Sequence, residues 1–448
     1  MQKSLTAVLI AGACLSFQAQ AADLIQVYQQ ALANDATFAS ARAALAAAQE
    51  RMPQGRSQLL PTVGLSGSYS QSNTDVQPYN EGQIGLTQTG GLGVITGVDT
   101  SSRNKSYSLA LSQPLFRWDR WETYEQSRLA QSIGEAQFAQ AQQDLITRVA
   151  QAYFDVLAAQ DTLESTRAQK SATTEQLASA KRNFEVGTQT ITDTHEAQAA
   201  YDQVVAQEFA AINDLDNKRA ALQSIIGGVP ETLAPLKAGV SLAAPEPAAI
   251  DAWVGAAEKQ NYGVLASTLA LESSKRDIKK SRAGHLPTLD LVSSVGRSSG
   301  TAQNNVLSKS IGVQWNVPLF NGFAITSKVR ESIALEDKAK NDLEATRRAA
   351  ALGARQAFLG VNSGLAQVKA LEAAEVSSQS SLESNKLGYQ VGVRINIDVL
   401  NAQRLLYSTR TTLAKARYDT IVNGLRLKAA SGSLKEADLA PVNGLLQK

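Results

Sequence analysis

The sequence carries one long pattern twice, and this duplication constrains the fold more than any other feature. Three sets of landmarks return in the same order: Leu60-Pro61-Thr62 as Leu286-Pro287-Thr288, Pro114-Leu115-Phe116 as Pro318-Leu319-Phe320, and Val186-Gly187 with Asp193 as Val391-Gly392 with Asp398. The separations of 226, 204 and 205 positions differ because the first copy holds 22 extra residues between its first two landmarks. A repeat of this period indicates duplication of a whole structural unit, since the short modules of solenoids recur every ~20–50 residues.

Residues 1–21 are predicted to form a secretory signal peptide that is not part of the fold. Lys3 supplies a positive charge, an apolar segment too short to cross a bilayer follows, and Ala19-Gln20-Ala21 provides a small-x-small cleavage site. A lipoprotein signal ending at Cys14 is the weaker alternative, because Ala11 stands where such signals usually carry Leu. Cleavage of the signal removes the only cysteine, so the mature chain is expected to form no disulfide.

Composition and motifs argue against an enzyme or a nucleic-acid-binding protein. The chain has 43 basic and 41 acidic residues, and this near balance provides no electrostatic basis for binding nucleic acid. The only histidines, His195 and His285, lack the spacing of a metal site, and no Walker loop or G-x-S-x-G motif is present. We therefore expect no catalysis, no cofactor and no metal, and any energy for transport must come from a partner.

Two stretches in each copy lack proline and contain few glycines. In the first copy, residues 119–185 contain no Pro and only one Gly, Gly134, while residues 188–226 contain neither. At ~1.5 Å per residue, the first of these stretches is a helix on the order of 100 Å long. The second copy repeats the pair, and a Val-Gly step separates the two helices each time. The pattern predicts long antiparallel helical hairpins at 118–226 and 322–431.

The apolar stripe on these helices is thin. In the first helix it consists of Leu145, Val149, Phe154 and Leu157, while Ala, Gln, Ser and Thr fill most other positions. Small side chains let neighbouring helices approach closely side by side, which favours a curved wall over a filled bundle. The helices alone leave an ordinary solvated coiled coil open as the alternative.

Each copy also contains two segments in which apolar and small polar residues alternate. The apolar members are Val63, Leu65, Tyr69, Tyr107, Leu109 and Leu111 in the first copy, and Leu289, Leu291, Val295, Ile311, Val313, Trp315 and Val317 in the second. These patterns predict β-hairpins at about 61–116 and 287–318, with polar loops near 73–104 and 299–306. The segments match the ~9–11 residues of a tilted strand that crosses a bilayer. No apolar run long enough for a membrane helix follows the signal peptide.

Aromatic residues gather where the strands meet the helices. They are Phe116, Trp118 and Trp121 in the first copy, and Trp315, Phe320 and Phe323 in the second. Such a cluster is typical of an interfacial girdle, although packing at a domain junction would look similar. Four strands cannot close a barrel, and open edges are not tolerated in lipid. The chain must therefore combine with copies of itself, giving eight strands in a dimer or twelve strands around a pore in a trimer.

The predicted domain organisation follows from these elements. Repeat 1 spans residues 22–226 and repeat 2 spans 248–431, and each repeat consists of a helix, a β-hairpin and a long helical hairpin. A linker rich in Pro, Gly and Ala occupies residues 227–247, and residues 432–448 form a short C-terminal tail. The fold class is mainly α with β.

Over essentially the whole mature chain, the sequence resembles the TolC family of outer-membrane channel-tunnels. The motifs that carry the resemblance are Gly284-His285-Leu286-Pro287-Thr288-Leu289-Asp290-Leu291, Phe184-Glu185-Val186-Gly187 with Ile191-Thr192-Asp193, and Gly388-Tyr389-Gln390-Val391-Gly392 with Asp398-Val399-Leu400. The resemblance implies a homotrimer whose twelve-stranded β-barrel lies in outer-membrane lipid and continues into a periplasmic α-barrel. It implies an exit duct for type I protein secretion or drug efflux, which a periplasmic adaptor and an inner-membrane ABC or proton-driven pump open by docking.

The resemblance also assigns functional positions, all at the ends of the helical hairpins. Tyr389 and Arg394 match a tyrosine and an arginine of the periplasmic gate, and Thr192 and Asp193 match the residues that they bond on the neighbouring coil. Asp398 matches the first of two constriction aspartates, but the second position is Asn401 here, which puts strong cation binding in doubt. The steps Val186-Gly187 and Val391-Gly392 are expected to be the adaptor-docking tips.

Two other functions are alternatives. A passive outer-membrane porin would contain the strands but would not need helices on the order of 100 Å long. A periplasmic coiled-coil structural protein would contain the helices but would not need four alternating strands with aromatic ends. The sequence names neither the exported substrate nor the adaptor.

Overall fold

The computed structural model describes residues 21–76, 84–86, 92–94, 98–229, 232–237, 239–301 and 303–447. The predicted signal peptide, apart from Ala21, and residues 77–83, 87–91 and 95–97 of the predicted loop at 73–104 lie outside these residues. The chain forms two compact units. Unit 1 contains the described residues of Met1–Ala44, Ala136–Leu265 and Glu344–Lys448, and unit 2 contains those of Leu45–Glu135 and Ala266–Leu343.

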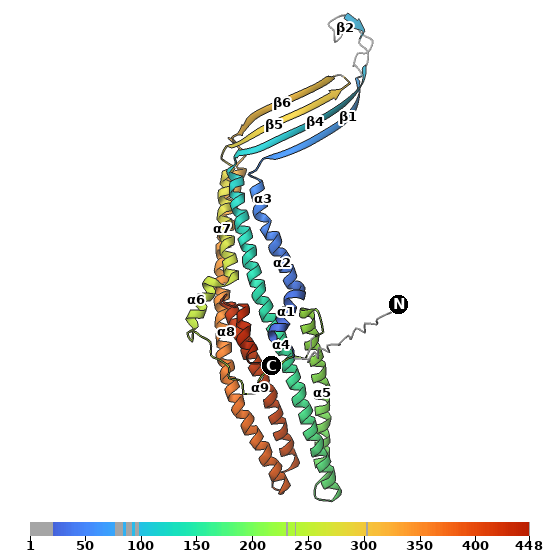
Figure 1. The fold of residues 1–448 in the computed structure, drawn as a ribbon, viewed down its shortest axis with the longest axis vertical. Coiled ribbons are helices and arrows are strands. Elements are labelled where there is room, and N and C mark those ends of the chain that lie inside the picture. The colour runs from blue at the N-terminus through green and yellow to red at the C-terminus, as the bar shows by residue number, and fades with distance from the viewer. Residues whose placement is uncertain are drawn as a thin grey trace, which may run out of the picture. The chain divides into compact units, whose positions relative to one another are not determined.

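Long helices dominate the structure and form the two helical hairpins. The first hairpin consists of α4 (Trp118–Glu185) and α5 (Ile191–Ile226), and the second of α8 (Ala324–Gln390) and α9 (Asn396–Ala430). In Figure 1 each shorter helix runs back beside its longer partner from a tight turn. Within the described residues, no helix combines the length and apolar character needed to cross a membrane. The predicted class, mainly α with two β-hairpins, is confirmed.

Unit 2 contains a four-stranded antiparallel sheet in the order β1-β4-β5-β6 (Figure 1). Its strands are β1 (Thr62–Val76), β4 (Val98–Phe116), β5 (Thr288–Gly300) and β6 (Gln303–Asn316), and a separate ribbon pairs β2 (Ile84–Leu86) with β3 (Leu92–Val94). The predicted loops were too long, because the strands extend into both polar segments. Ser, Thr and Asn do not interrupt the backbone ladder, and Ser hydroxyls pair across it, as Ser68 and Ser106 do at 2.8 Å.

The strand register places the predicted apolar residues on one face of this sheet. Leu65 pairs with Leu109, which pairs in turn with Val295. Directly paired residues of an antiparallel sheet point to the same side, and the same registers carry the other predicted apolar residues to that face, except Val317, which follows the end of β6. The same face also carries Lys105, Arg297 and Lys309. Ser, Gly and Ala occupy most of the opposite face. The sheet is therefore mainly apolar on one side and small and polar on the other.

The single helix predicted before each β-hairpin is broken in the structure. The first copy contains α1 (Leu24–Asn34), α2 (Ala36–Gln49) and α3 (Arg51–Ser57), and the second contains α6 (Ile250–Gln260) and α7 (Tyr262–Ala283). The first copy is broken at Asp35 and at Glu50, and the second is broken at Asn261, 226 positions after Asp35. Asp35 Oδ1 accepts a bond from the Phe38 amide at 2.6 Å, and Asn261 Oδ1 accepts one from the Gly263 amide at 2.9 Å. Each residue is an N-cap that begins a new helix.

The middle of α4 lies at the centre of the main hydrophobic core, in unit 1. The four predicted stripe residues, Leu145, Val149, Phe154 and Leu157, are each 0–1 % exposed. They pack in one cluster with apolar residues of α1, α5 and α9. The stripe is therefore the contact face of the helix, as predicted. Small residues flank it and let the neighbouring helices come close.

The two ends of the described chain meet in unit 1. The Leu24 amide donates to Asn443 Oδ1 at 3.0 Å, and Asn443 Nδ2 donates to Asp23 Oδ2 at 2.9 Å. Leu446 is 1 % exposed and forms an antiparallel bridge with Leu236 of the predicted linker. The segment predicted as a tail therefore contains packed structure, namely η1 (Glu436–Asp438) and α10 (Leu439–Asn443).

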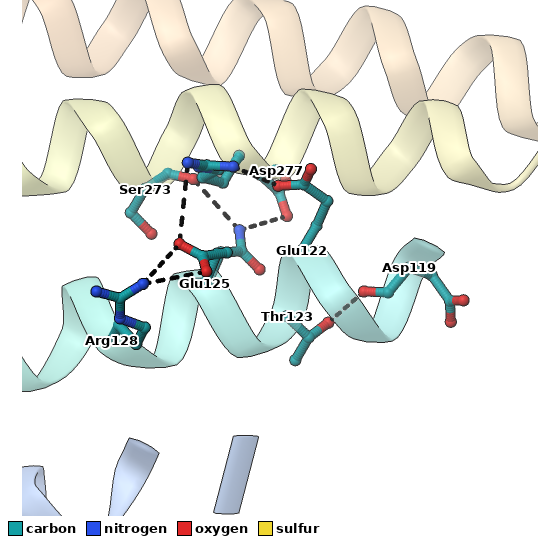
Figure 2. A network of polar contacts seen from close by, with 9 residues as sticks. Asp119, Glu122, Thr123, Glu125, Arg128, Ser273 and Asp277 are labelled. Carbon is teal, nitrogen blue, oxygen red and sulfur yellow. Dashed lines mark hydrogen bonds and ion pairs between the residues drawn. The ribbon is translucent and has the colours of Figure 1, made fainter. Parts of the chain in front are cut away.

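Polar contacts join α4 to α7 within unit 2 (Figure 2). Glu122 is 1 % exposed and its carboxylate accepts a bond from Arg276 Nη1 at 3.3 Å. Glu125 lies 3.9 Å from the same guanidinium and also pairs with Arg128 on its own helix. A buried carboxylate is stable only while it is paired and hydrogen-bonded. The Glu122–Arg276 pair therefore fixes how α7 lies against α4.

We predict that Arg276→Ala lowers the free energy of unfolding by about 3–5 kcal/mol, because it leaves the Glu122 carboxylate buried without its partner. The matched control is Arg128→Ala, which removes an exposed ion pair within one helix and is expected to cost below ~1 kcal/mol. Thermal unfolding followed by circular dichroism measures both. Equal midpoints for the two variants would contradict the structural role of Arg276.

Candidate functional site

The tips of the two helical hairpins have the same backbone structure. Gly187 and Gly392 follow the ends of α4 and α8 with φ values of 75° and 81°. In the first tip the Gly187 amide donates to the Phe184 carbonyl and the Thr188 amide to the Asn183 carbonyl, both at 2.9 Å. The second tip repeats both bonds 205 positions later. This is the Schellman termination of a helix, in which a left-handed residue after the helix is usually Gly.

Both tips expose apolar side chains. Val186 and Val391, which precede the glycines, are 72 % and 66 % exposed, and Val393 is 75 % exposed. Leu387 and Ile395 are also exposed. Clustered exposed apolar groups at the end of a structure are typical of an interaction surface.

The side chains that start the returning helices differ between the tips. Thr190 and Asp193 form a capping box on α5, in which the Thr190 amide and hydroxyl both donate to Asp193 Oδ2, at 3.1 and 2.8 Å. The equivalent residues of the second tip are Ile395 and Asp398, and Ile395 has no side-chain oxygen to cap α9. The Asp398 carboxylate pairs instead with Arg394, at 3.7 Å.

Polar contacts also join the second hairpin to the first near the tips. The Tyr389 hydroxyl, from the end of α8, donates to Gln189 Oε1 at 2.7 Å in the turn between α4 and α5. Asn396 Nδ2 donates to the backbone carbonyl of Asp193 at 3.0 Å, and Gln176 Nε2 donates to Asn396 Oδ1 at 2.6 Å. The two hairpins of one chain are thus bonded to each other beside the predicted gate.

The structure brings all four predicted gate residues to the tips, and it gives Arg394, Tyr389 and Asp193 partners within the chain that were not expected. Arg394 contacts Asp398 and not Asp193, whose carboxylate is held by the α5 cap. Tyr389 contacts Gln189. The gate contacts inferred from the resemblance therefore stay a prediction for the assembled state.

The two predicted constriction residues differ in their surroundings. The side chain of Asp398 is 34 % exposed and that of its partner Arg394 is 59 % exposed. Asn401, one turn further along α9, is exposed. An ion pair with this much exposure contributes little stability, so Asp398 and Arg394 can exchange partners at small cost.

Sequence reasoning missed Gln189, Asn396 and Gln176. A signal for the first was present, because Gln189 and Arg394 occupy equivalent positions of the two repeats. Asn396 replaces Ile191 of the first copy at a helix start. No comparable signal marks Gln176, which is one of many polar residues on α4.

Further from the tips, the two hairpins meet at a partly buried hydroxyl and carboxyl pair. The Tyr418 hydroxyl of α9 donates to Asp161 Oδ2 of α4 at 2.6 Å. Burial raises the pKa of the Asp161 carboxyl, and the bond from Tyr418 opposes this shift. Burial, together with the nearby Asp161 carboxylate, raises the pKa of the Tyr418 phenol, so that the hydroxyl stays protonated and remains a donor at neutral pH.

No group of three or more His, Cys, Asp or Glu side chains placed to hold a metal ion occurs in the described part of the chain. The candidate site therefore consists of the paired tips, their exposed apolar residues and the polar contacts between the hairpins.

Comparison with known proteins gives full-length matches. The model of the outer membrane efflux protein family matches residues 27–228 and 253–433. The outer membrane protein TolC of Escherichia coli is 34 % identical over 462 residues, covering 100 % of this chain and 90 % of TolC. The alkaline protease secretion protein AprF of Pseudomonas aeruginosa is 31 % identical over 422 residues, covering 93 % of this chain and 85 % of AprF.

Solved structures share the fold at lower sequence identity. The CmeC outer membrane channel of Campylobacter jejuni gives a TM-score of 0.79 at 19 % identity, covering 95 % of this chain and 90 % of CmeC. The outer membrane protein VceC of Vibrio cholerae gives 0.76 at 18 % identity, covering 92 % of this chain and 96 % of VceC.

Proposed function

Because the chain belongs to the family of outer membrane efflux proteins, we propose that three copies of it form an exit duct for type I protein secretion, drug efflux or both. It is an outer-membrane channel and not an enzyme. The relative named for protease secretion is 31 % identical and a relative named for efflux, from Brucella suis, is 25 % identical. This difference favours protein secretion as the first process to test.

The observation that carries the proposal is the one-sided sheet with two free edges. β1 and β6 are the outermost strands, and each pairs along one side only. Unpaired N–H and C=O groups are not tolerated in lipid, so the edges require partner strands. Three copies joined edge to edge make a closed sheet of twelve strands, which is wide enough for a pore. Its apolar face contacts lipid and its serine-rich face lines the lumen.

The gate of the duct consists of Thr192, Asp193, Tyr389 and Arg394. Tyr389 supports this role because it already joins the second hairpin to the first through Gln189. Arg394 supports it because its contact with Asp398 is exposed and 3.7 Å long. Its guanidinium can therefore turn to acceptors on a neighbouring subunit when three tips meet, and such charge-assisted bonds are stronger than neutral ones.

Asp398 and Asn401 form the constriction inside the gate. They lie three residues apart on α9, so they occupy adjacent positions on one helix face. In a trimer, three Asp398 carboxylates near the axis concentrate negative charge in a narrow space, which favours cations. Asn401 adds amides where a second ring of carboxylates would double this charge.

The hairpin tips dock a periplasmic adaptor, and an inner-membrane pump supplies the energy. The support lies in the shared termination at Gly187 and Gly392 and in the exposed valines beside them. Two equivalent tips on each chain present a repeated apolar surface, which fits the helical hairpins of an adaptor.

Two observations argue against the alternatives. A passive porin does not require helical hairpins with matching tips, or polar bonds between those hairpins. A periplasmic coiled-coil protein would expose the whole apolar face of the sheet to water, and apolar patches of that size are rare on soluble proteins.

We predict that the purified protein is a detergent-dependent trimer with a low conductance, and that Arg394→Ser combined with Tyr389→Phe raises the conductance while the trimer remains. The substitutions remove the guanidinium and the hydroxyl bond to Gln189. Single-channel recording in planar bilayers measures the change, with Tyr407→Phe on α9 as the control. A stable soluble monomer would contradict the duct, and an unchanged conductance in an intact trimer would contradict the gate.

A second prediction concerns ion preference. Asp398→Ala is expected to lower cation selectivity and relieve block by multivalent cations, because it removes the three carboxylates. Asn401→Asp is expected to do the opposite. Reversal potentials in asymmetric salt and titration of the block measure both effects. If neither substitution alters selectivity or block, the constriction lies elsewhere in the duct.

A third prediction concerns docking. Replacing Gly187 and Gly392 with Leu is expected to abolish export while trimers still assemble, because a side chain resists the left-handed backbone by ~1–2 kcal/mol per residue. A Cβ atom at either position would meet no other atom within 4 Å, so the expected loss comes from backbone strain and not from a steric clash. Gly353→Leu on α8 is the matched control, since its surroundings are equally open and its φ is not positive. Export that survives the tip substitutions would reject the docking assignment.

A further inference from the structure

Asn396 is the first residue of α9 and is 0 % exposed. Burying a side-chain amide is unfavourable unless its donor and acceptor both find partners. Asn396 satisfies both, and its two partners lie on the other hairpin. Three helices, α9, α5 and α4, therefore meet at this one side chain.

The bonds fix the orientation of the amide. The backbone carbonyl of Asp193 can only accept, so the group that faces it at 3.0 Å must be the Asn396 NH₂. The Asn396 oxygen then faces Gln176, whose NH₂ donates at 2.6 Å. Gln176 is 9 % exposed, so this second bond is also shielded from water.

The repeat shows that the asparagine is not required by the shape of the tip. The equivalent residue of the first copy is Ile191, which begins α5 from the same backbone turn and is 46 % exposed. The same helix start thus accommodates an aliphatic residue facing solvent. At position 396 the side chain is turned inward and contacts the other hairpin.

Apolar and polar contacts both join the hairpins at this level. The buried cluster around Leu400 contains Leu177, Ala180 and Ala197, and the partly buried Tyr201 and Ile397 pack against it. The contact of α9 with its own partner α8 contains Leu382, Val399 and Leu406. Near the tips, α9 is therefore held to α8 by apolar packing, and to α4 and α5 by the polar bonds of Asn396 beside a small apolar cluster.

We propose that Asn396 is a positioning residue that clamps the start of α9 onto the first hairpin and so holds the duct in its closed state. This inference rests on the proposed gate. Asn396 lies two residues from Arg394 and two from Asp398, so its bonds to the first hairpin fix the positions of these gate and constriction side chains. Release of its two bonds frees the second tip while the α8–α9 packing stays intact.

The test uses full-length trimers in planar bilayers. Asn396→Ala removes both bonds, and we expect it to raise the open-to-closed ratio by roughly five- to tenfold. Gln176→Ala removes the shared bond and is expected to open the channel in the same direction. The variant with both substitutions is expected to open no further than Asn396→Ala, because the free-energy effects of removing the two partners of one bond do not add.

The controls separate the clamp from a general loss of structure and from the gate itself. Asn385→Ala, near the end of α8, removes an amide that bonds only to Ser381 on its own helix and should leave the open fraction unchanged. Asn396→Ile introduces the residue of the first copy, so it keeps the volume filled and should open the channel as Asn396→Ala does.

The outcomes distinguish the inference from the proposed function. Two results would overturn the clamp. The first is a double variant in which the effects of Asn396→Ala and Gln176→Ala on the open-to-closed ratio multiply. The second is an open fraction equal to that of the wild type in both Asn396→Ala and Asn396→Ile. If the Arg394→Ser, Tyr389→Phe variant still opens in that case, the gate stands and only the clamp fails. If the wild-type protein forms no channel, the proposed function itself fails.

Discussion

The unpaired backbone groups along the outer edges of β1 and β6 are the constraint on which the rest of the structure depends. Each chain supplies four strands and leaves both edges open. The described residues leave the apolar face of the sheet uncovered, since residues such as Val63, Leu65 and Ile311 are largely exposed. In the proposed assembly, other copies complete the backbone pairing and lipid covers the apolar face, so stability depends on protein concentration and on lipid.

The hairpins combine two kinds of contact with different consequences. Within the main core, Phe154 and Tyr418 stack at a centroid distance of 5.6 Å, and large apolar residues from several helices pack together. Near the tips, amide and hydroxyl bonds join the hairpins beside a smaller apolar cluster around Leu177 and Leu400. Polar bonds can be exchanged for bonds to water or to other partners at low net cost, whereas apolar packing cannot. Movement at the tips is therefore compatible with a rigid middle.

The sequence predicts those elements whose signals are local. Alternation of apolar residues gave the strands and their common face, because side chains of a strand alternate strictly. The absence of Pro and the scarcity of Gly predicted the long helices, and Gly187 and Gly392 predicted the ends of α4 and α8. The breaks at Asp35 and Asn261 were missed, although their capping residue types and their spacing of 226 positions carried a signal. The contacts of Asn396 with Gln176 and of Tyr389 with Gln189 join residues about 200 positions apart, and no local pattern encodes them.

The meeting of the two chain ends in unit 1 has a consequence for the order of folding. The bonds between Asn443 and residues 23–24 span 419 and 420 positions, and Leu446 belongs to the same core as Ala22 and Leu24. Contacts of such long range form late, because the whole intervening chain must first be brought together. The core of unit 1 is thus completed only after residues 439–446 have emerged, and a chain released before them lacks a segment of this core.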